Sequence, residues 1–262
     1  MTEILLREDQ DAVATLTLNR PEALNALSEE MMTAMQDEFE RLAVDSSTRV
    51  IVIKGAGRAF CAGHDLKQMQ GKRQAPDGGK AYYAALLAQC TRMMTTIPKL
   101  PQPVIAQVQG MATAAGCQLV ATCDMAVCTD TTQFGVNGVN IGLFCSTPMV
   151  ALSRNVPRKH AFEMLSTGEF LPAEKALAMG LVNKVVPADA LEDETHELAI
   201  KVASKLGSAV KVGKRAYYEQ LEMGLDAAYM HTSRVIVDNL LHPETVEGMQ
   251  AFLDKRPPDW KQ

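Results

Sequence analysis

Residues 113–124, TAAGCQLVATCD, join a run of small side chains to a single carboxamide, Gln118, in an otherwise apolar stretch. We expect a helix to begin near Ala114. The first N–H groups of a helix have no intrahelical partner, and small side chains leave them accessible, so a ligand oxygen that gains negative charge could bind there. The same small residues would also let a helix pack tightly against a sheet, and spacing alone favours that structural role.

A glycine-rich loop at residues 55–66, GAGRAFCAGHDL, is a second place where backbone groups could do chemistry. The third glycine of a dinucleotide fingerprint would fall on Phe60, so we do not expect a nucleotide site of that kind. The loop is either an ordinary surface loop or one whose N–H groups face a ligand, with Gly63 permitting close approach. One N–H from each segment would form an oxyanion hole for a carbonyl that becomes an enolate.

The elements that must position these segments recur along the chain. Apolar and polar residues alternate in AVATLTLNRP, which predicts a strand, and SEEMMTAMQDEFERLAVD predicts a helix with Ser28 as its N-cap. Further strands are expected at VIVIKG, VIAQVQG and MAVCT, with a helix at residues 82–97 and a polar stretch at residues 70–80. Recurring strands, helices and glycine-rich loops predict an α/β core over residues 1–190, followed by a helical section over residues 191–262.

Composition narrows the function. The chain has 262 residues, of which 47% are hydrophobic and 22% are charged, and its net charge is -5. This is typical of a soluble globular protein and argues against general binding of nucleic acid or anionic membrane. The six cysteines form no C-x-x-C pair, which favours reduced buried thiols over disulfides or a metal site. No signal peptide, transit peptide or transmembrane run is evident, so we expect a cytoplasmic protein, or a mitochondrial matrix protein if this is a mature eukaryotic chain.

The motifs together resemble the enoyl-CoA hydratase/isomerase, or crotonase, superfamily. The resemblance is carried by GAGRAFCAGHDL, by VIAQVQGMATAAGCQLVATCDMAV and by FGVNGVNIGL, with LNRPEALNAL near the start and FLDKRPPDW at the end. It extends over about residues 5–257. The segments AAGCQLVA, GVNIGLFCSTP and VPRK are most similar to the branch called enoyl-CoA hydratase domain-containing protein 3.

This resemblance implies the crotonase-like spiral of ββα units, with the helical C-terminal section serving for trimerisation. It implies a homotrimer or a dimer of trimers. The implied substrate is an acyl-CoA thioester, with coenzyme A as part of the substrate and no separate cofactor.

The resemblance also assigns roles to residues. The oxyanion hole maps onto the backbone N–H groups of His64 and Ala115, and relatives usually have glycine at the second position. The segment that lines the adenine and pantetheine of coenzyme A maps onto Ala26, Ala62, Gly63, His64, Asp65 and Leu66. Phe252 and Lys255 map onto positions that reach the nucleotide end of coenzyme A, often from a neighbouring subunit. Glu22 stands where relatives often have lysine.

Both carboxylates expected of a hydratase are missing. In hydratases the positions of Gln118 and Gly138 are glutamates, which activate water and deliver a proton to the α-carbon. A glutamine has no proton to exchange near neutral pH and can only orient water or a substrate hydroxyl. Glycine supplies nothing beyond room.

Other side chains near these positions could replace them. Cys145 and Ser146 fall where some relatives with other reactions have a catalytic aspartate. Cys145 would be a base only with a lowered pKa, and a buried structural thiol is the simpler interpretation. Ser146, followed by a threonine and a proline, is typical of a helix start. The His64 ring could titrate, although its backbone alone could matter. Asp65 is expected to fix its loop, while Asn137 and Asn140 could bind a polar acyl group or serve turns.

We therefore expect a protein that binds an acyl-CoA thioester and polarises its carbonyl. It would be an enzyme of the hydratase, isomerase or hydrolase kind that uses unusual residues, or a family member with weak hydratase activity. The alternative, from another class, is a catalytically silent acyl-CoA binding or regulatory protein.

Overall fold

The computed structural model describes residues 3–260, and its centre is a six-stranded sheet. The strands are, in spatial order, β1 (Leu5–Gln10), β2 (Val13–Leu18), β3 (Val50–Gly55), β4 (Val104–Val108), β6 (Met125–Thr129) and β9 (Lys184–Val186). β1 and β2 form an antiparallel hairpin, and every later neighbour is parallel. Parallel neighbours need crossover connections, which the intervening helices provide.

Helices follow most strands. Those of the core are α1 (Glu29–Val44), α2 (Leu66–Gly71), α3 (Lys80–Thr96), α4 (Ala115–Thr122), α5 (Pro148–Asn155), α6 (Arg158–Thr167), α7 (Ala173–Ala178) and α8 (Leu191–Ala203). Three more follow, α9 (Gly207–Gln220), α10 (Leu225–Leu240) and α11 (Pro243–Leu253). No helix among residues 3–260 is both long and apolar enough to cross a membrane.

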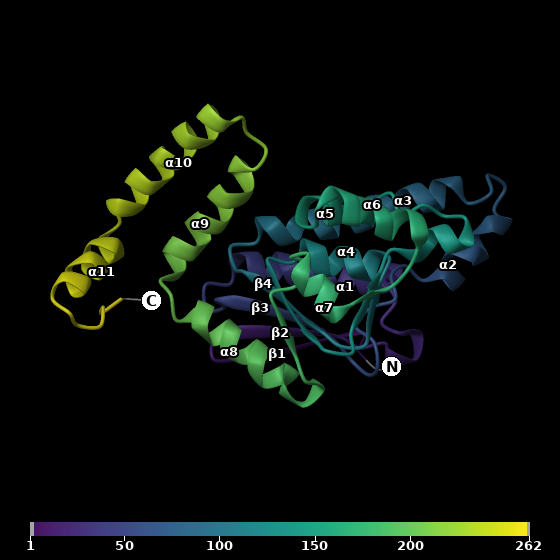
Figure 1. The fold of residues 1–262 in the computed structure, drawn as a ribbon, viewed down its shortest axis with the longest axis horizontal. Coiled ribbons are helices and arrows are strands. Elements are labelled where there is room, and N and C mark those ends of the chain that lie inside the picture. Colours follow the sequence, from purple (N-terminus) through teal and green to yellow (C-terminus); the bar gives the residue numbers. More distant parts are fainter. Residues whose placement is uncertain (1–2, 261–262) are drawn as a thin grey trace.

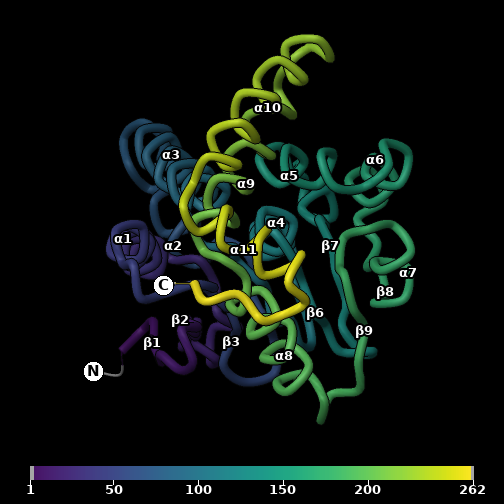
Figure 2. Tube along the Cα trace, turned by 90° about the vertical axis from the view of Figure 1, so that its left-hand side faces the viewer, coloured from purple at the N-terminus to yellow at the C-terminus, as the bar shows by residue number. Residues whose placement is uncertain are grey.

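Both faces of the six-stranded sheet are buried, because successive side chains of a strand point to opposite faces. On β3, Ile51 and Ile53 lie in one apolar cluster with Phe39 of α1. Val50 and Val52 lie in another cluster, with Ala199 of α8. Figure 2 shows this layering, with α8 on one side of the strands and α1 and α4 on the other.

A second, smaller sheet carries the segment singled out by the sequence. It consists of β5 (Met111–Thr113), β7 (Gln133–Gly135) and β8 (Leu171–Pro172), with β5 parallel to β7 and β7 antiparallel to β8. β5 leads almost directly into α4, so this sheet fixes where α4 begins.

The last three helices form an arm that extends away from the sheet (Figure 1). α8 is different, because it packs on β3, β4 and β6. α10 contains no buried residue and contacts mainly its neighbours α9 and α11. The predicted helical section 191–262 therefore holds one helix that covers the sheet and three that do not.

The predicted α/β crotonase-like fold is confirmed, as is the helix capped by Ser28, whose hydroxyl accepts from the N–H of Met31. One local expectation was wrong, because the helix near Ser146 begins at Pro148 with Thr147 before it. The sequence also missed α2, which overlaps the first two residues of the polar stretch at residues 70–80. Ser146 Oγ instead donates to the carbonyl of Phe144.

Candidate functional site

The two loops lie side by side because short backbone pairings join them. Cys61 forms a bridge with Ala112 of β5: the Cys61 N–H donates to Met111, and the Thr113 N–H donates to Cys61, at 3.2 and 3.0 Å. Hydrogen bonds of this kind align two backbone segments as two strands are aligned. The residues that follow on each side, 63–64 and 114–115, are thereby brought together.

Gly63 permits a close approach between its loop and the start of α4, whereas the sequence suggested a close approach to a ligand. Its φ is +86°, and a Cβ there would lie 2.9 Å from Ala114 Cβ and 3.0 Å from the Ala115 nitrogen. A side chain at residue 63 would push the loops apart and would also be strained in the left-handed region. Glycine at this position therefore sets the spacing between His64 and the start of α4.

The N–H groups of His64 and Ala115 are both available. Among residues 3–260, no hydrogen bond that the structure shows uses either of them. Ala115 is the first residue of α4, where an N–H lacks an intrahelical partner and the helix dipole favours negative charge. The two groups suit an oxygen that gains charge during a reaction.

Ala114 is strained, a feature that the sequence did not reveal. Its φ of 51° and ψ of -119° lie in a region that side chains avoid, whereas Ala115 has no positive φ. Two hydrogen bonds hold Ala114: its N–H donates to Gly135 at 2.8 Å, and its carbonyl accepts from the Gln118 N–H at 3.0 Å. Such strain persists only where the surroundings impose it, and it concentrates at functional sites.

A third motif, LNRPEALNAL, is tied to the same loop through Asn25. This side chain is fully buried, and its Nδ2 donates to the carbonyls of Ala56 and Ala59 at 2.9 and 2.8 Å. The Leu27 N–H donates to Gly63 at 2.7 Å. The buried asparagine was missed from the sequence, although its position between alternating leucines was a usable signal.

Gln118 follows Ala115 by one helical turn and is buried, with 7% of its surface exposed. Its Oε1 has no hydrogen-bond partner. No hydrogen bond joins its side chain to any residue that the structure describes. A buried amide oxygen without a partner costs free energy, so contacts within the described residues do not account for Oε1 of Gln118.

Both ring nitrogens of His64 are buried, although the residue as a whole is half-buried, and neither nitrogen has a hydrogen-bond partner. Burial lowers the pKa of His64 below its usual 6.5, and the Leu27 carbonyl opposes that shift without reaching hydrogen-bond geometry. Desolvation disfavours the charged imidazolium. The lowered pKa favours the neutral form of the ring.

Gly138, the residue that we expected at the position of the second hydratase glutamate, has no room for a side chain. A Cβ at Gly138 would lie 2.2 Å from the Leu143 carbonyl oxygen and 2.9 Å from Cys145 Sγ. Cys145 is buried, and burial raises the pKa of its thiol, against the effect of the Gly138 N–H. A raised pKa disfavours the thiolate that a base would need.

Asp65 fixes its loop, as its sequence position suggested. One carboxylate oxygen caps α2 by accepting from the N–H groups of Lys67 and Gln68, and the other accepts from Arg20 at 2.8 Å. Although burial opposes it, the N–H of Gln68 and the Arg20 guanidinium lower the pKa of Asp65. Glu22 Oε1 lies 3.8 Å from Nε of the same guanidinium.

The other residues that we expected to bind coenzyme A or the acyl group lie partly in the core and partly on the surface. Ala26 is buried and the Ala62 N–H donates to Leu24, while Leu66 is exposed at the start of α2. Among the candidate asparagines, Asn140 donates to the Gly168 carbonyl. Asn137 Oδ1 accepts from the Thr113 hydroxyl at 2.6 Å, which ties it to β5.

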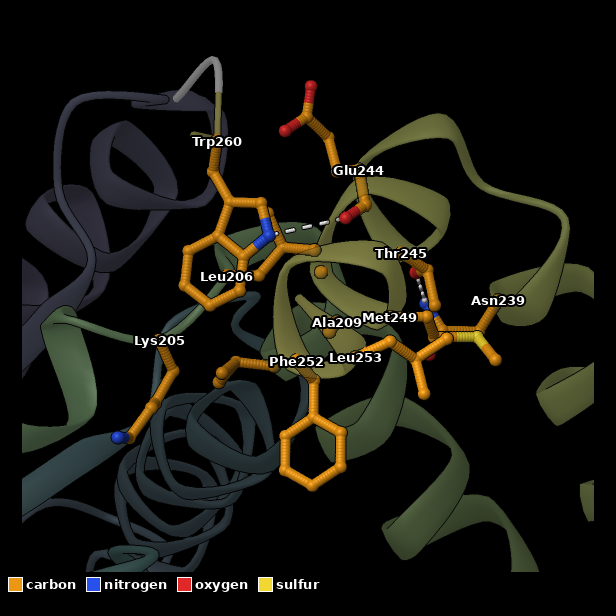
Figure 3. A pocket seen from close by; sticks show the side chains of 12 residues that line it. Lys205, Leu206, Ala209, Asn239, Glu244, Thr245, Met249, Phe252, Leu253 and Trp260 are labelled. Carbon is orange, nitrogen blue, oxygen red and sulfur yellow. Dashed lines mark hydrogen bonds between the residues drawn. The ribbon is translucent and has the colours of Figure 1, made fainter. Parts of the chain in front are cut away.

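Phe252 lies in α11, the last helix of the arm, and Lys255 follows the end of that helix by two residues. Phe252 is exposed and borders a groove of about 490 Å³ between α9 and α11 (Figure 3). The groove is mainly apolar, and Trp260 closes one side by donating from its indole to the Glu244 carbonyl. Figure 1 shows α11, which carries Phe252, beyond α9 and away from α4.

Residues 8–262 match the family model described as enoyl-CoA hydratase/isomerase. The chain belongs to this family. It is 44% identical over 259 residues to "Enoyl-CoA hydratase domain-containing protein 3, mitochondrial" of Xenopus laevis, covering 99% of this chain and 86% of the relative.

Solved structures of similar proteins support the same family membership. An enoyl-CoA hydratase of Mycobacterium smegmatis is 51% identical, with a TM-score of 0.95 and full coverage of both chains. Human enoyl-CoA hydratase domain-containing protein 3 is 44% identical, with a TM-score of 0.94, covering 98% of this chain and 100% of the other. The expected superfamily and the similarity to the domain-containing protein 3 branch are confirmed.

Proposed function

We propose that the protein binds an acyl-CoA thioester and polarises its carbonyl between the N–H groups of His64 and Ala115. The observation that carries this proposal is the pair of unused N–H donors, held together at Gly63, with one at the start of α4. The choice of a thioester as the ligand rests on membership of the enoyl-CoA hydratase/isomerase family. The helix dipole adds to the attraction for an enolate oxygen.

The reaction is proposed to differ from efficient hydration. Gln118 cannot exchange a proton, and Gly138 has neither a side chain nor room for one. We propose an acyl-CoA enzyme in which enolate stabilisation carries the chemistry and hydration is weak. The same two positions favour the second candidate, a catalytically silent acyl-CoA binding protein. A turnover screen over several acyl-CoA thioesters separates the two.

We further propose a homotrimer or a dimer of trimers, with Phe252 and Lys255 reaching the nucleotide end of coenzyme A across a subunit boundary. The position of α11 in the arm, away from α4, supports this arrangement (Figure 1). The named vertebrate relatives are described as mitochondrial. For this chain we propose the cytoplasm, or the mitochondrial matrix if it is a processed eukaryotic protein.

Calorimetry tests the proposed function. Acetoacetyl-CoA is expected to bind, and acetoacetate is not. Equal affinity for both, or no binding of the coenzyme A form, would overturn the proposal.

A pair of glycine variants then locates the site. Gly63→Ala is expected to weaken binding at least about tenfold, because the new methyl group would displace Ala114 and Ala115. Gly78→Ala is the matched control, since Gly78 also has a positive φ, of +66°, but nothing lies within 4 Å of its added Cβ. Gly78→Ala therefore has the same kind of backbone strain as Gly63→Ala but brings its new Cβ into contact with no neighbouring atom.

A further inference from the structure

Ala114 carries a methyl group that its backbone conformation disfavours. Its φ is 51° and its ψ is -119°. Leu24 has the same φ of 51°, but its ψ of 37° places it in the left-handed helical region, which residues with side chains can enter. The ψ of Ala114 lies outside that region, so glycine would adopt this conformation with less strain. The backbone therefore gives no reason for an alanine at this position.

The hydrogen bonds of Ala114 do not need its methyl group. Its N–H donates to Gly135 and its carbonyl accepts from Gln118, through backbone atoms that a glycine also has. As the residue before α4, Ala114 gives the helix no side-chain cap. Its methyl group packs against the core, but the residue is only half-buried, and a partly buried methyl group stabilises a fold by less than such strain costs. Stability alone does not account for the alanine.

The methyl group borders the space between the two loops. A Cβ at Gly63 would lie 2.9 Å from Ala114 Cβ and 3.0 Å from the Ala115 nitrogen, so these two atoms face the same small space. His64, with the other free N–H, directly follows Gly63. A carbonyl oxygen that binds both N–H groups therefore brings the substituents of its carbonyl carbon beside the methyl group of Ala114.

The substituent on the side of Ala114 is the acyl group. The sulfur of a thioester continues into coenzyme A, which is large and charged and needs the open side of the site, where Leu66 is exposed. The acyl group then lies on the buried side, where α4 holds the unpartnered Oε1 of Gln118, three residues after Ala115 on the same helical face. Ala114 directly precedes α4, so its methyl group lies next to the second carbon of the acyl group.

We infer that the methyl group of Ala114 excludes acyl groups that are branched at the second carbon. The substrates are thioesters whose second carbon carries no methyl branch, and branches from the third carbon onward are accepted. This inference rests on the proposed function, because it assumes that the thioester carbonyl binds between His64 and Ala115. It adds the shape of the acyl group that this site admits.

The test compares two isomeric thioesters. 3-Methylbutyryl-CoA and 2,2-dimethylpropionyl-CoA have the same composition and differ only in the position of their branches. The second has no hydrogen on its second carbon, so no rotation can turn a hydrogen atom toward Ala114. By calorimetry, the wild-type protein is expected to bind 3-methylbutyryl-CoA at least about tenfold more tightly, and in Ala114→Gly the ratio of the two affinities is expected to fall to about one.

Two further measurements separate the effect of the methyl group from a structural effect. Ala114→Gly is expected to raise the Tm, because it relieves the strain. Ala121→Gly is the matched control, since it removes one methyl group from the buried core side of the same helix. It is expected to lower the Tm and to keep the affinity ratio of the wild type. If Ala114→Gly lowers the Tm or fails to fold, Ala114 has a structural role and the inference is overturned.

The outcomes of the binding test are distinct. If the wild-type protein binds both isomers equally, the inference is wrong and the proposed function stands. If the preference survives in Ala114→Gly, another group excludes the branches, and if Ala121→Gly abolishes it too, a looser α4 is the cause; either result overturns the inference. If no thioester binds to the wild-type protein, the proposed function itself fails, and the inference fails with it.

Discussion

Lys214 Nζ lies 2.6 Å from Asp124 Oδ2, and this buried ion pair joins the first helix of the arm to the segment that follows α4. The ammonium group also donates to the carbonyls of Ile97 and Gln102, both at 2.9 Å. Tyr218, one turn further along α9, donates to the other Asp124 oxygen at 2.8 Å. Because Asp124 comes two residues after α4, the root of the arm is fastened close to the helix that carries Ala115 and Gln118.

Lys214→Met is therefore expected to destabilise the protein strongly. It leaves the Asp124 carboxylate buried without its cation, which costs about 3–5 kcal/mol. Tyr218→Phe removes one hydrogen bond to the same carboxylate and should cost about 1–2 kcal/mol. The measurement is urea unfolding at fixed protein concentration. Arg215→Met is the control, since the exposed Arg215–Glu219 pair is 3.9 Å long and should be worth less than about 0.5 kcal/mol. Equal losses for Lys214→Met and Arg215→Met would contradict this account.

The arm should be an oligomer interface. α10 exposes large apolar side chains along its length, namely Leu225, Tyr229, Met230, Ile236, Val237 and Leu240. Monomeric proteins rarely expose apolar patches of this extent. We expect light scattering to give three or six times the chain mass of 28.5 kDa. Ile236→Glu should shift the protein toward smaller species, whereas Val44→Glu, at an exposed position of the core, should not. A monomeric wild-type protein would rule the interface out.

Much of the fold could be predicted from local patterns. The Ser28 cap and the apolar face of α1, and the continuous apolar strand β3, are signals that act within a few residues, and the structure reproduces them. α2 was missed because it is short and polar, and only its Asp65 cap marks it. The predicted N-cap, Ser146, is one residue too early, since Thr147 directly precedes the helix that begins at Pro148. Serine and threonine are both common at the start of a helix, so the sequence did not distinguish them.

The candidate site was harder to predict, because it depends on contacts between distant segments. The pairing of Cys61 with Ala112 and the approach of Gly63 to Ala114 join residues about fifty positions apart. The lack of space at Gly138 is caused by the Leu143 carbonyl oxygen. The position of a backbone oxygen cannot be inferred from the types of the residues around it. The sequence indicated that neither Gln118 nor Gly138 can act as an acid or a base. The structure adds that position 138 has no room for a side chain.

Ala114→Gly is expected to stabilise the protein by about 1 kcal/mol. Glycine adopts the φ and ψ of Ala114 without strain, and the relief, roughly 1–3 kcal/mol, exceeds the extra entropy of the unfolded chain. Ala115→Gly is the control, because that residue is helical and glycine should cost about 1 kcal/mol there. The measurement is the midpoint of thermal unfolding. A lower midpoint for Ala114→Gly would show that the alanine is not strained.

His64 should make stability depend on pH. Its pKa is lowered in the folded state, so near and below the ordinary value of 6.5 the unfolded chain binds the proton more readily. Stability therefore rises with pH up to about 6.5 and is lost as the pH falls below it. His64→Gln should remove this part of the dependence, as measured by urea unfolding between pH 5 and 8, roughly the range in which histidine titrates. An unchanged slope in the variant would mean that the ring is not desolvated.

The last prediction concerns hydration. The wild-type protein should hydrate crotonyl-CoA slowly, because each missing acid or base costs about 10²–10⁴-fold and two positions lack one. The oxyanion donors alone still leave a measurable rate, of order 10²–10³ per donor. Gln118→Glu restores one carboxylate at a position that already holds a side chain of the same length. We expect it to raise the hydration rate about tenfold, and Gln118→Met to leave no such gain.

Gly138→Glu should behave differently, for a reason that the backbone shows. Gly138 does not have a positive φ, so its angles would accept a side chain, but the Cβ would collide with the Leu143 carbonyl oxygen. We expect this variant to lower the Tm. The hydration rate of the double variant should stay below that expected for two working carboxylates, because the two groups act as a unit only when both are correctly placed.

Crotonyl-CoA hydration by the wild type at about 10²–10³ s⁻¹, the upper part of the usual enzyme range, would show that other residues supply the acid and base. Cys145→Ala, Ser146→Ala and His64→Ala would then identify them by the rate that each one removes.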